Sequence, residues 1–402
     1  MSTFKTIFLS AVTTLFIVSA GFAYFYYTKI KESKTENGNG EMVVQHAANN
    51  FVIDSKKDTS NDRSTANNSL YNSRQTVITK TVAKVSPAVV GITVTEIQKY
   101  RDFWSYDPFF REFFGDRVYL REVKGLGSGT LISPDGYIIT NDHVAGNAVK
   151  IIVTLTDGRH FDAKIVGSDI TSDVCLLKID SENLPYLKFG DSDDILIGEW
   201  VIALGNPFGL FELNKKPTVT VGVVSSLGMN LGVQKNRYYY DMIQTDAAIN
   251  TGNSGGPLVN SIGEIIGMNT LIYSGSGGNI GVGFAIPINK VKEIIADLKE
   301  YGKVDRNFWT GLSIQTITEG IAKYFNLKNT EGVIVTDIVP DSPADKAGLQ
   351  VADIILEMNK VKINDDVTMI NLLHTFKTND TVQFKILRKG ETLIKTMILE
   401  PK

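Results

Sequence analysis

The chain has 402 residues, of which 43% are hydrophobic, so it is long and apolar enough for two or three domains with real cores and is not a disordered protein. Its formal net charge of −3 excludes a general electrostatic attraction to nucleic acid or anionic lipid, so partners must be sought in local sites. The single cysteine, Cys175, cannot form an intrachain disulfide and lies in an apolar run, where we expect a buried, unreactive thiol.

The N-terminal segment has the character of a membrane span. Residues 7–27 are almost wholly apolar and carry no charge, which is about the length that a helix needs to cross a ~30 Å hydrocarbon core. Ser19 to Ala23 could serve as the cleavage site of a signal peptide, but aromatic residues continue through 24–27, as in an interfacial belt. We therefore expect a transmembrane anchor within residues 1–28, with a cleaved signal peptide as the alternative. Lysines on both sides leave its orientation open.

A polar segment follows the span and leads to a folded body. Residues 29–75 contain too few apolar residues to offset the entropy of ordering, so they predict a flexible linker. Apolar residues then recur at helical spacing from Val77 to Val85, and Pro87 ends that helix. The run 88–94 predicts the first strand of the body.

Residues 98–124 are unusually rich in aromatic side chains among Arg and Asp, with little regular period. One interpretation is an ordinary long loop over the core. The other is a loop that docks on a neighbouring subunit or on an active site, because exposed aromatic residues on this scale usually mark contacts. We favour the contact loop.

Short strands joined by tight turns come next, and His143 directly follows one of them. Strands are expected over 127–133 and 137–140, joined by a turn that contains Gly136. A single histidine is more often structural than catalytic. The other three histidines lie in the linker, at a turn and in a predicted helix, whereas His143 ends a buried strand, where it is placed to act as a base.

Asp173 stands at the head of a later apolar strand, after predicted strands over 149–155 and 161–167. A carboxylate there can hold one nitrogen of the His143 ring and stabilise the imidazolium that forms when the other nitrogen accepts a proton. The alternative for Asp173 is a surface turn without a functional role.

The segment around Ser254 presents one hydroxyl between glycines at the entrance to an apolar strand. A serine is a good nucleophile only when a base takes its proton and backbone N–H groups face the new oxyanion. We expect the N–H groups of Gly252 and Ser254 to form that oxyanion hole. By itself the segment also fits a tight strand connection, but the chain order His, Asp, Ser favours a catalytic triad.

The last part of the chain predicts the end of one domain and a second, smaller one. Strands are expected over 262–270 and 280–287, and apolar residues recur at helical spacing from Ile288 to Leu298. Farther on, Ser342 precedes a proline in the pattern of a capped short helix that ends at Gly348. From these patterns alone, the final segment could be a generic small α/β domain.

Six short motifs occur in a fixed order: GSG at 127–129, TNDHV at 140–144, DVCLLK at 173–178, GNPFG at 205–209, QTDAAIN at 244–250 and GNSGGPL at 252–258. Together they resemble the HtrA/Deg family of serine proteases over roughly residues 76–402. The resemblance implies a mostly β fold, with a chymotrypsin-like double β-barrel protease domain over 76–303 and a C-terminal α/β PDZ domain over 304–402. It also implies two six-stranded barrels, a triad of His143, Asp173 and Ser254 between them, and no cofactor or metal.

The same resemblance implies partners and binding sites. A homotrimer or larger assembly is expected, with the body outside the inner membrane and a role in extracytoplasmic quality control. Ala248, Leu271 and Ile272 would line the specificity pocket and favour small aliphatic residues before the cut. The loop Trp309-Thr310-Gly311-Leu312 would bind a free C-terminal carboxylate, beside an edge strand over 313–316. The opposite wall would come from a helix that carries the four apolar residues Met369, Leu372, Leu373 and Phe376.

Three departures limit the assignment of a subfamily. A single span and a single trailing domain resemble DegS-type members, whereas the aromatic segment 98–124 resembles the long loop of DegP- and DegQ-type members. The segment 210–217 is longer than usual, and Met229 stands where many relatives have an arginine that links a sensor loop to the oxyanion region. Arg237 is a candidate substitute for that arginine.

Two function classes therefore compete. The first is an ATP-independent serine endoprotease that cleaves misfolded or regulatory proteins and is gated by peptide binding. The second is a chaperone or scaffold that uses the same barrels and groove only to bind unfolded chains. The presence of all three triad residues favours the protease.

Overall fold

The computed structural model describes residues 71–101, 118–206, 215–272 and 281–402. The expected anchor at 1–28 and most of the linker at 29–75 lie outside these residues. In the described ranges, no helix is long and apolar enough to cross a membrane.

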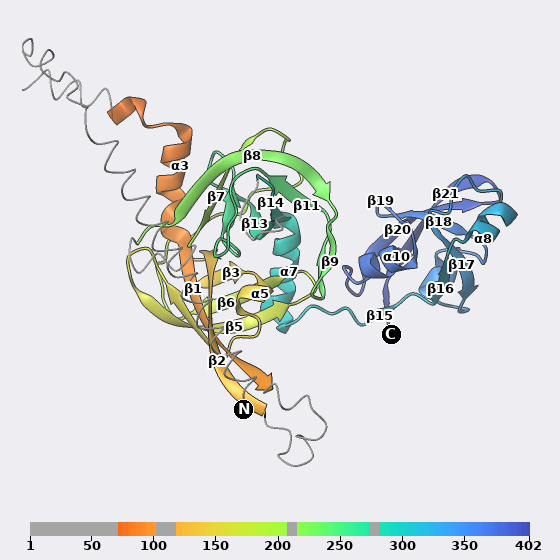
Figure 1. Ribbon diagram of the computed structural model, residues 1–402, viewed down its shortest axis with the longest axis horizontal. Coiled ribbons are helices and arrows are strands. Elements are labelled where there is room, and N and C mark those ends of the chain that lie inside the picture. The colour runs from red at the N-terminus through yellow and green to blue at the C-terminus, as the bar shows by residue number, and fades with distance from the viewer. Residues whose placement is uncertain (1–70, 102–117, 207–214, 273–280) are drawn as a thin grey trace, which may run out of the picture. The chain divides into compact units, whose positions relative to one another are not determined.

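The first part of the body is a closed barrel in which strands pair in the order β1-β2-β3-β6-β5-β4 (Figure 1). Its strands are β1 (Val89–Arg101), β2 (Val118–Leu131), β3 (Tyr137–Thr140), β4 (Lys150–Thr154), β5 (His160–Asp169) and β6 (Val174–Ile179). The expected turn between β2 and β3 is present, with Gly136 at a φ of 99° that a side chain rarely allows. Buried aliphatic residues from β1, β2, β3, β4 and β6 fill the barrel, and β5 packs against them with partly buried residues such as Val166. Cys175 is fully buried in this core, as predicted.

The predicted N-terminal helix is present as α3 (Val77–Val85), followed by a 3-10 turn, Ser86–Ala88, that contains the proline. The Thr76 side chain caps α3 by accepting from the N–H of Thr79. Val85 is buried in the barrel core, and the Thr81 hydroxyl donates to the carbonyl of Ser261.

The prediction of a loop over 98–124 was wrong at both ends of that segment. The antiparallel ladder between β1 and β2 continues without a break to the pair Arg101–Val118. Where side chains are described, apolar residues such as Ile97 and Leu120 are exposed, so this part of the ladder has no alternation of buried apolar and exposed polar residues. The ladder pairs backbone groups whatever the side chains, which is why the pattern did not reveal it. Residues 102–117, with most of the aromatic side chains, lie outside the described residues.

A second closed barrel pairs in the order β11-β14-β13-β12-β7-β8. Its strands are β7 (Trp200–Gly205), β8 (Thr218–Met229), β11 (Met242–Thr245), β12 (Pro257–Val259), β13 (Ile265–Ile272) and β14 (Gly283–Pro287). A hairpin of β9 (Gly232–Gln234) and β10 (Arg237–Tyr239) lies between β8 and β11 in the chain. The predicted helix is present as α7 (Ile288–Tyr301), which buries its apolar face and ends at Gly302 in a left-handed conformation.

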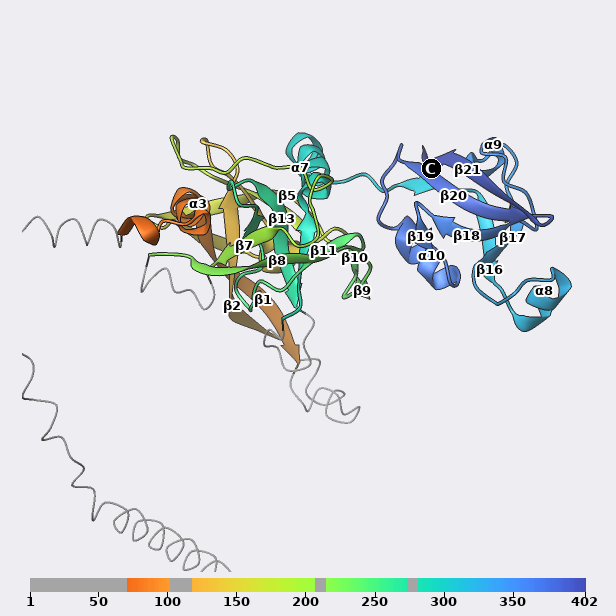
Figure 2. The ribbon, with the colours of Figure 1, turned by 90° about the horizontal axis from the view of Figure 1, so that it is seen from above.

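The C-terminal domain, drawn in blue, is a separate sheet with three short helices (Figure 2). The sheet order is β16 (Leu312–Thr316), β17 (Val333–Ile338), β18 (Ile354–Met358), β20 (Thr381–Arg388) and β21 (Glu391–Ile398), with β19 (Val361–Lys362) paired to β18. Strands β15 (Phe308–Trp309) and β22 (Glu400–Pro401) pair with each other, and the helices are α8 (Glu319–Tyr324), α9 (Pro343–Lys346) and α10 (Asp366–Leu373). Ser342 caps α9 ahead of its proline, as predicted.

Candidate active site

The predicted base and its carboxylate lie together at one end of the first barrel. His143 is in α5 (Asp142–Ala145), the short helix that follows β3, and Asp173 immediately precedes β6. The Nδ1 atom of His143 lies 2.8 Å from Oδ2 of Asp173 and 3.0 Å from Oδ1. The Asp173 side chain is completely buried, whereas 31% of the His143 side chain is exposed. The carboxylate therefore fixes one ring nitrogen and leaves the other edge of the ring accessible.

Asp173 accepts hydrogen bonds from several parts of the fold. Besides the ring, the backbone N–H of His143 donates to Oδ1 at 3.0 Å, and the hydroxyls of Thr270 and Tyr239 donate to Oδ2 at 2.8 and 3.0 Å. Burial by itself raises the pKa of Asp173, but hydrogen bonds from His143 and Thr270 outweigh it, so the pKa lies below its ordinary value. Asp173 is thus held as a carboxylate in a dry environment. The alternative of a surface turn is excluded by its complete burial.

Arg237 contacts Asp173, a pairing that the sequence did not reveal. Its Nε donates to Oδ1 of Asp173 at 3.0 Å, and its terminal NH2 group donates to Oδ2 of Asp142 at 2.7 Å. We expected Arg237 as a candidate link between a sensor loop and the oxyanion region. In the structure its guanidinium is instead bonded to the carboxylates of Asp142 and Asp173. The sequence indicated only that Arg237, beside two tyrosines in a short strand, needs a partner for its charge, and not which residue that partner is.

The backbone around Ser254 is bonded to both barrels. The N–H of Ser128, from β2, donates to the carbonyl of Ser254 at 2.9 Å, and the Ser128 hydroxyl donates to the carbonyl of Gly252. On the other side, the N–H of Gly255 donates to the carbonyl of Asn269 in β13 at 2.9 Å. Gly255 has a φ of 83°, and a Cβ there would collide with the carbonyl of Ser128, so the tight turn requires glycine.

The Ser254 hydroxyl does not reach the base in this structure. It donates to the carbonyl of Thr270 at 3.0 Å, and no hydrogen bond joins it to His143 in the described residues. Within those same ranges, the N–H groups of Gly252 and Ser254 have no hydrogen-bond acceptor. Thr270 links the three residues of the expected triad, because it bonds to Ser254 through its carbonyl and to Asp173, the partner of His143, through its hydroxyl.

Two family models match the chain, a trypsin-like peptidase domain over residues 127–268 and a PDZ domain over residues 311–397. A probable periplasmic serine endoprotease, DegP-like, from Pseudomonas putida (strain W619) is 42% identical over 333 residues, which cover 78% of this chain and 67% of the relative. The chain belongs to this family of HtrA-type, DegP-like serine endoproteases. It is a serine endopeptidase, with a mostly β fold of a double-barrel protease domain and one PDZ domain.

Other members of the HtrA-type family are similar over most of the same residues. A DegP-like endoprotease of Chlamydia pneumoniae is 42% identical over 334 residues, covering 78% of this chain and 66% of the relative. A solved structure of a variant of the HtrA-type protease AlgW with a decapeptide is 37% identical, with a TM-score of 0.63, covering 81% of this chain and 97% of that one. A solved structure of AlgW with a tripeptide is 36% identical, with a TM-score of 0.59, and the match covers 80% of this chain and 96% of that one.

The expected specificity residues of this HtrA-type protease are only partly described. Ala248 is half-buried, and its carbonyl accepts from the Thr220 hydroxyl at 2.8 Å. The backbones of Leu271 and Ile272 pair with β14, but their side chains lie outside the described part of the chain.

The expected carboxylate-binding loop lies between β15 and β16. Two carbonyls of this loop accept hydrogen bonds from within the PDZ domain. The Thr310 carbonyl accepts from the N–H of Ala344 at 3.0 Å, and the Gly311 carbonyl accepts from the N–H of Val339 at 2.9 Å. Gly311 has a φ of 68°, and a Cβ there would collide with the side chain of Ser342. The strand β16 is at the edge of the sheet, next only to β17, as predicted for an edge that accepts a peptide.

The predicted opposite wall of that groove needs a correction. Met369 and Leu372 of α10 are buried in the core of the PDZ domain, and only Leu373 and Phe376 are partly buried at its margin. Helical spacing showed that these residues lie near one face but not that the face is turned inward. Asp366, at the start of α10, bonds to the Thr316 side chain of β16, so strand and helix are joined at one end.

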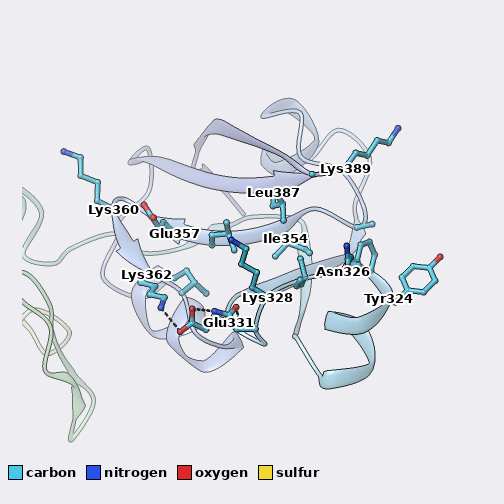
Figure 3. Close-up of a pocket in the computed structure, with 17 residues that line it drawn as sticks. Tyr324, Asn326, Lys328, Glu331, Ile354, Glu357, Lys360, Lys362, Leu387 and Lys389 are labelled. Atoms are coloured by element: carbon cyan, nitrogen blue, oxygen red, sulfur yellow. Dashed lines mark hydrogen bonds and ion pairs between the residues drawn. The ribbon is translucent and has the colours of Figure 1, made fainter.

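The PDZ domain also has a hollow of about 890 Å³ apart from the catalytic residues (Figure 3). Its floor includes Ile354 and Leu387, and lysines stand on its rim. One of them, Lys362, is paired with Glu331 at 2.6 Å. None of the residues expected to bind a carboxylate lines this hollow, so it is distinct from the groove beside β16. The described residues also contain no group of three or more acidic, histidine or cysteine side chains that could hold a metal.

Proposed function

We propose that this HtrA-type endopeptidase hydrolyses unfolded or misfolded proteins with His143 as base, Asp173 as its orienting carboxylate and Ser254 as nucleophile. The observation that carries the proposal is the contact between the buried Asp173 carboxylate and Nδ1 of a partly exposed His143, beside the loop that carries Ser254. A ring held in this way keeps Nε2 free to accept a proton.

The proposed reaction begins with a rotation of the Ser254 side chain. Its hydroxyl leaves the carbonyl of Thr270, donates to Nε2 of His143 and attacks the scissile carbonyl carbon while the proton moves to the ring. The negatively charged Asp173 stabilises the imidazolium, which then donates the proton to the leaving amine. A water molecule then gives a proton to His143 and attacks the acyl carbon, and the ring returns that proton to Oγ of Ser254 as the new carboxylic acid leaves.

The N–H groups of Gly252 and Ser254 are the proposed oxyanion hole. Both lack a protein acceptor in the described residues, so they are available to a developing negative charge. The φ of Gly252, 97°, is in the region that glycine tolerates and sets the direction of the turn.

We infer a preference for small aliphatic residues before the cleaved bond. Ala248, on the expected wall of the pocket, carries no charge to pair with Lys or Arg, and the sequence opposite it, Leu271 and Ile272, is apolar. Mass spectrometry of the products tests this preference, and mostly Lys or Arg before the cut would contradict it.

We also propose that the PDZ domain binds free C termini of proteins at Trp309 to Leu312. An extended peptide can add to the free edge of β16, with its carboxylate at the loop before that strand. Solved structures of AlgW contain a decapeptide or a tripeptide, which is consistent with peptide binding in the family. Isothermal titration with peptides that have free or amidated C termini tests this assignment, and equal affinity for both would contradict it.

The proposed location is the cell envelope, because curated relatives are named as periplasmic. Anchoring by residues 7–27, a homotrimeric or larger assembly and a role in envelope stress remain parts of the proposal. Alkaline extraction of membranes tests the anchor, since an anchored chain stays in the pellet.

One observation favours the second function, a chaperone that binds without cleaving: the Ser254 hydroxyl is bonded to Thr270 rather than to His143. The two functions are separated by incubating the full-length protein with a fluorophosphonate and with a chemically unfolded protein. We expect labelling of Ser254 and peptide products. Binding of the unfolded protein without labelling or cleavage would favour the chaperone.

A further inference from the structure

Three charged side chains form a continuous buried group behind His143. The guanidinium of Arg237 lies between the carboxylates of Asp142 and Asp173, at 2.7 and 3.0 Å. Only 11% of the Arg237 side chain is exposed, and the exposed fractions are 8% for Asp142 and 0% for Asp173. Buried charges interact strongly because solvent screens them little, so each charge here acts on the others and on the ring of His143.

The hairpin that carries Arg237 is bonded to the turn that carries Asp173. Lys235 and Asn236 have φ values of 51° and 65°, as in the two-residue turn that joins β9 to β10. In β10, the N–H of Tyr238 donates to the carbonyl of Thr171 at 2.9 Å. The side chains on either side of Tyr238 both reach the Asp173 carboxylate, Arg237 through Nε and Tyr239 through its hydroxyl. Backbone and side chains of one strand thus hold this carboxylate in place.

Within the described ranges, three ionisable groups close to this buried cluster are either uncharged or already paired. Burial raises the pKa of the Cys175 thiol to about 12, and burial together with Asp173 raises the pKa of Tyr239, so both remain protonated. Asp169, at the end of β5, is paired with Arg306 at 2.9 Å. The buried cluster bonded to His143 in the described part of the chain therefore consists of two carboxylates and one guanidinium, with a net charge of −1.

We propose that Arg237 is a positioning residue that orients Asp173 and, by sharing its charge between Asp173 and Asp142, sets the pH at which His143 becomes available as a base. This inference rests on the proposed triad. If Arg237 were absent, the negative charge of Asp142 would also stabilise the protonated ring of His143. The neutral ring, which is the form that acts as a base, would then be reached only at a higher pH. The arginine reduces that effect while Asp173 remains ionised to stabilise the imidazolium formed during the reaction.

The measurement is the rate constant for fluorophosphonate labelling of Ser254 in the full-length protein as a function of pH. It reports on the nucleophile and its base without the binding of a protein substrate. For Arg237→Gln we expect the midpoint of the acidic limb to rise by about 0.5 to 1 pH unit, because two carboxylates remain without a cation. For Asp142→Asn we expect a shift of similar size to lower pH, because one negative charge is removed.

Two further variants separate charge from structure. Arg237→Lys keeps the charge but not the two-pronged donor geometry, so the plateau rate should fall while the midpoint stays near that of the wild type. Arg159→Gln removes an arginine whose partner, Asp157, lies with it at the surface, and it should leave the whole profile unchanged. A midpoint does not depend on the fraction of active protein, so partial misfolding does not imitate the expected shift.

The outcomes are distinguishable. Equal midpoints in wild type, Arg237→Gln and Asp142→Asn, or shifts of both variants in one direction, would overturn the role of Arg237 and leave the triad intact. If Arg237→Gln does not fold, the inference is tested by Asp142→Asn, whose midpoint must move to lower pH. A wild type that shows no labelling at Ser254 at any pH would refute the proposed triad, and this inference with it.

Discussion

His143 and Asp173, from the first barrel, are joined by short contacts, whereas Ser254, from the second barrel, donates its hydroxyl to the Thr270 carbonyl instead of to the base. Asp173 accepts from five different groups, which fixes the carboxylate and, through it, the ring. The amides proposed to hold the oxyanion have no partner in the described residues. The half of the site that holds His143 is therefore fixed by hydrogen bonds, whereas in the proposed reaction the serine must first leave the Thr270 carbonyl.

Thr270 connects the two halves. Its hydroxyl donates to Asp173 at 2.8 Å and its carbonyl accepts from Ser254 at 3.0 Å. Rotation about a single side-chain bond of a partly exposed serine takes place in picoseconds to nanoseconds, so the hydroxyl can sample the base without movement of the barrels.

The largest expected effect comes from removing the nucleophile. In Ser254→Ala, the fixed half of the site is intact but no hydroxyl can attack, so we expect kcat for an unfolded protein substrate to fall by about 10⁴ to 10⁶-fold. Circular dichroism should show an unchanged fold. Cleavage by the purified variant at the wild-type rate would place the nucleophile elsewhere.

The next largest effect is expected from changing Asp173, the carboxylate that holds the His143 ring. Asp173→Asn replaces an acceptor of several hydrogen bonds by an amide that itself donates, so the ring loses the tautomer that leaves Nε2 free, and we expect kcat to fall by about 10⁴-fold. Fluorophosphonate labelling should slow in parallel. A loss below about tenfold, in a protein that is still folded, would mean that Asp173 does not orient the base.

A smaller effect tests the connection between the halves. Thr270→Val removes one donor to Asp173 but keeps the shape and the carbonyl, so we expect kcat to fall by about tenfold, equivalent to about 1.4 kcal/mol. Thr81→Val is the matched control, because the Thr81 hydroxyl donates to a backbone carbonyl away from the site. Equal losses in the two variants would indicate a general effect on stability.

The smallest effect is on stability at acidic pH. The pKa of Asp173 is lowered in the folded protein, so its carboxylate stabilises the fold above about pH 4, the ordinary range for an aspartate, and this contribution is lost as the pH falls through the lower folded value. The difference in Tm between wild type and Asp173→Asn should therefore shrink from about pH 6 to about pH 3. A constant difference over that range would contradict an ionised, stabilising Asp173.

The sequence was informative where a role belongs to a contiguous motif. The segments around His143, Asp173 and Ser254 each predicted a strand end or a tight turn, and the structure brings the three together. Arg237 and Tyr239 could not be found in this way, because their contacts with Asp173 join residues 64 and 66 positions apart. Such contacts depend on how one strand crosses a distant turn, which no local pattern specifies.

Two other errors have a related cause. Helical spacing showed that Met369 and Leu372 share one side of α10, but an amphipathic pattern does not distinguish a groove wall from a core. The far ends of β1 and β2 were missed because the sequence there has no hydrophobic period, although the backbones pair.

Ser128 has a consequence for how the enzyme unfolds. This residue of the first barrel bonds to the backbone of the nucleophile segment, through its N–H to Ser254 and through its hydroxyl to Gly252, and its oxygen accepts from the N–H of Asn206. Separation of the barrels would break these hydrogen bonds to the nucleophile segment. Opening of the barrel interface and loss of the reactive serine should be one cooperative event, so amide hydrogen exchange at Ser128 and fluorophosphonate reactivity should change at the same denaturant concentration.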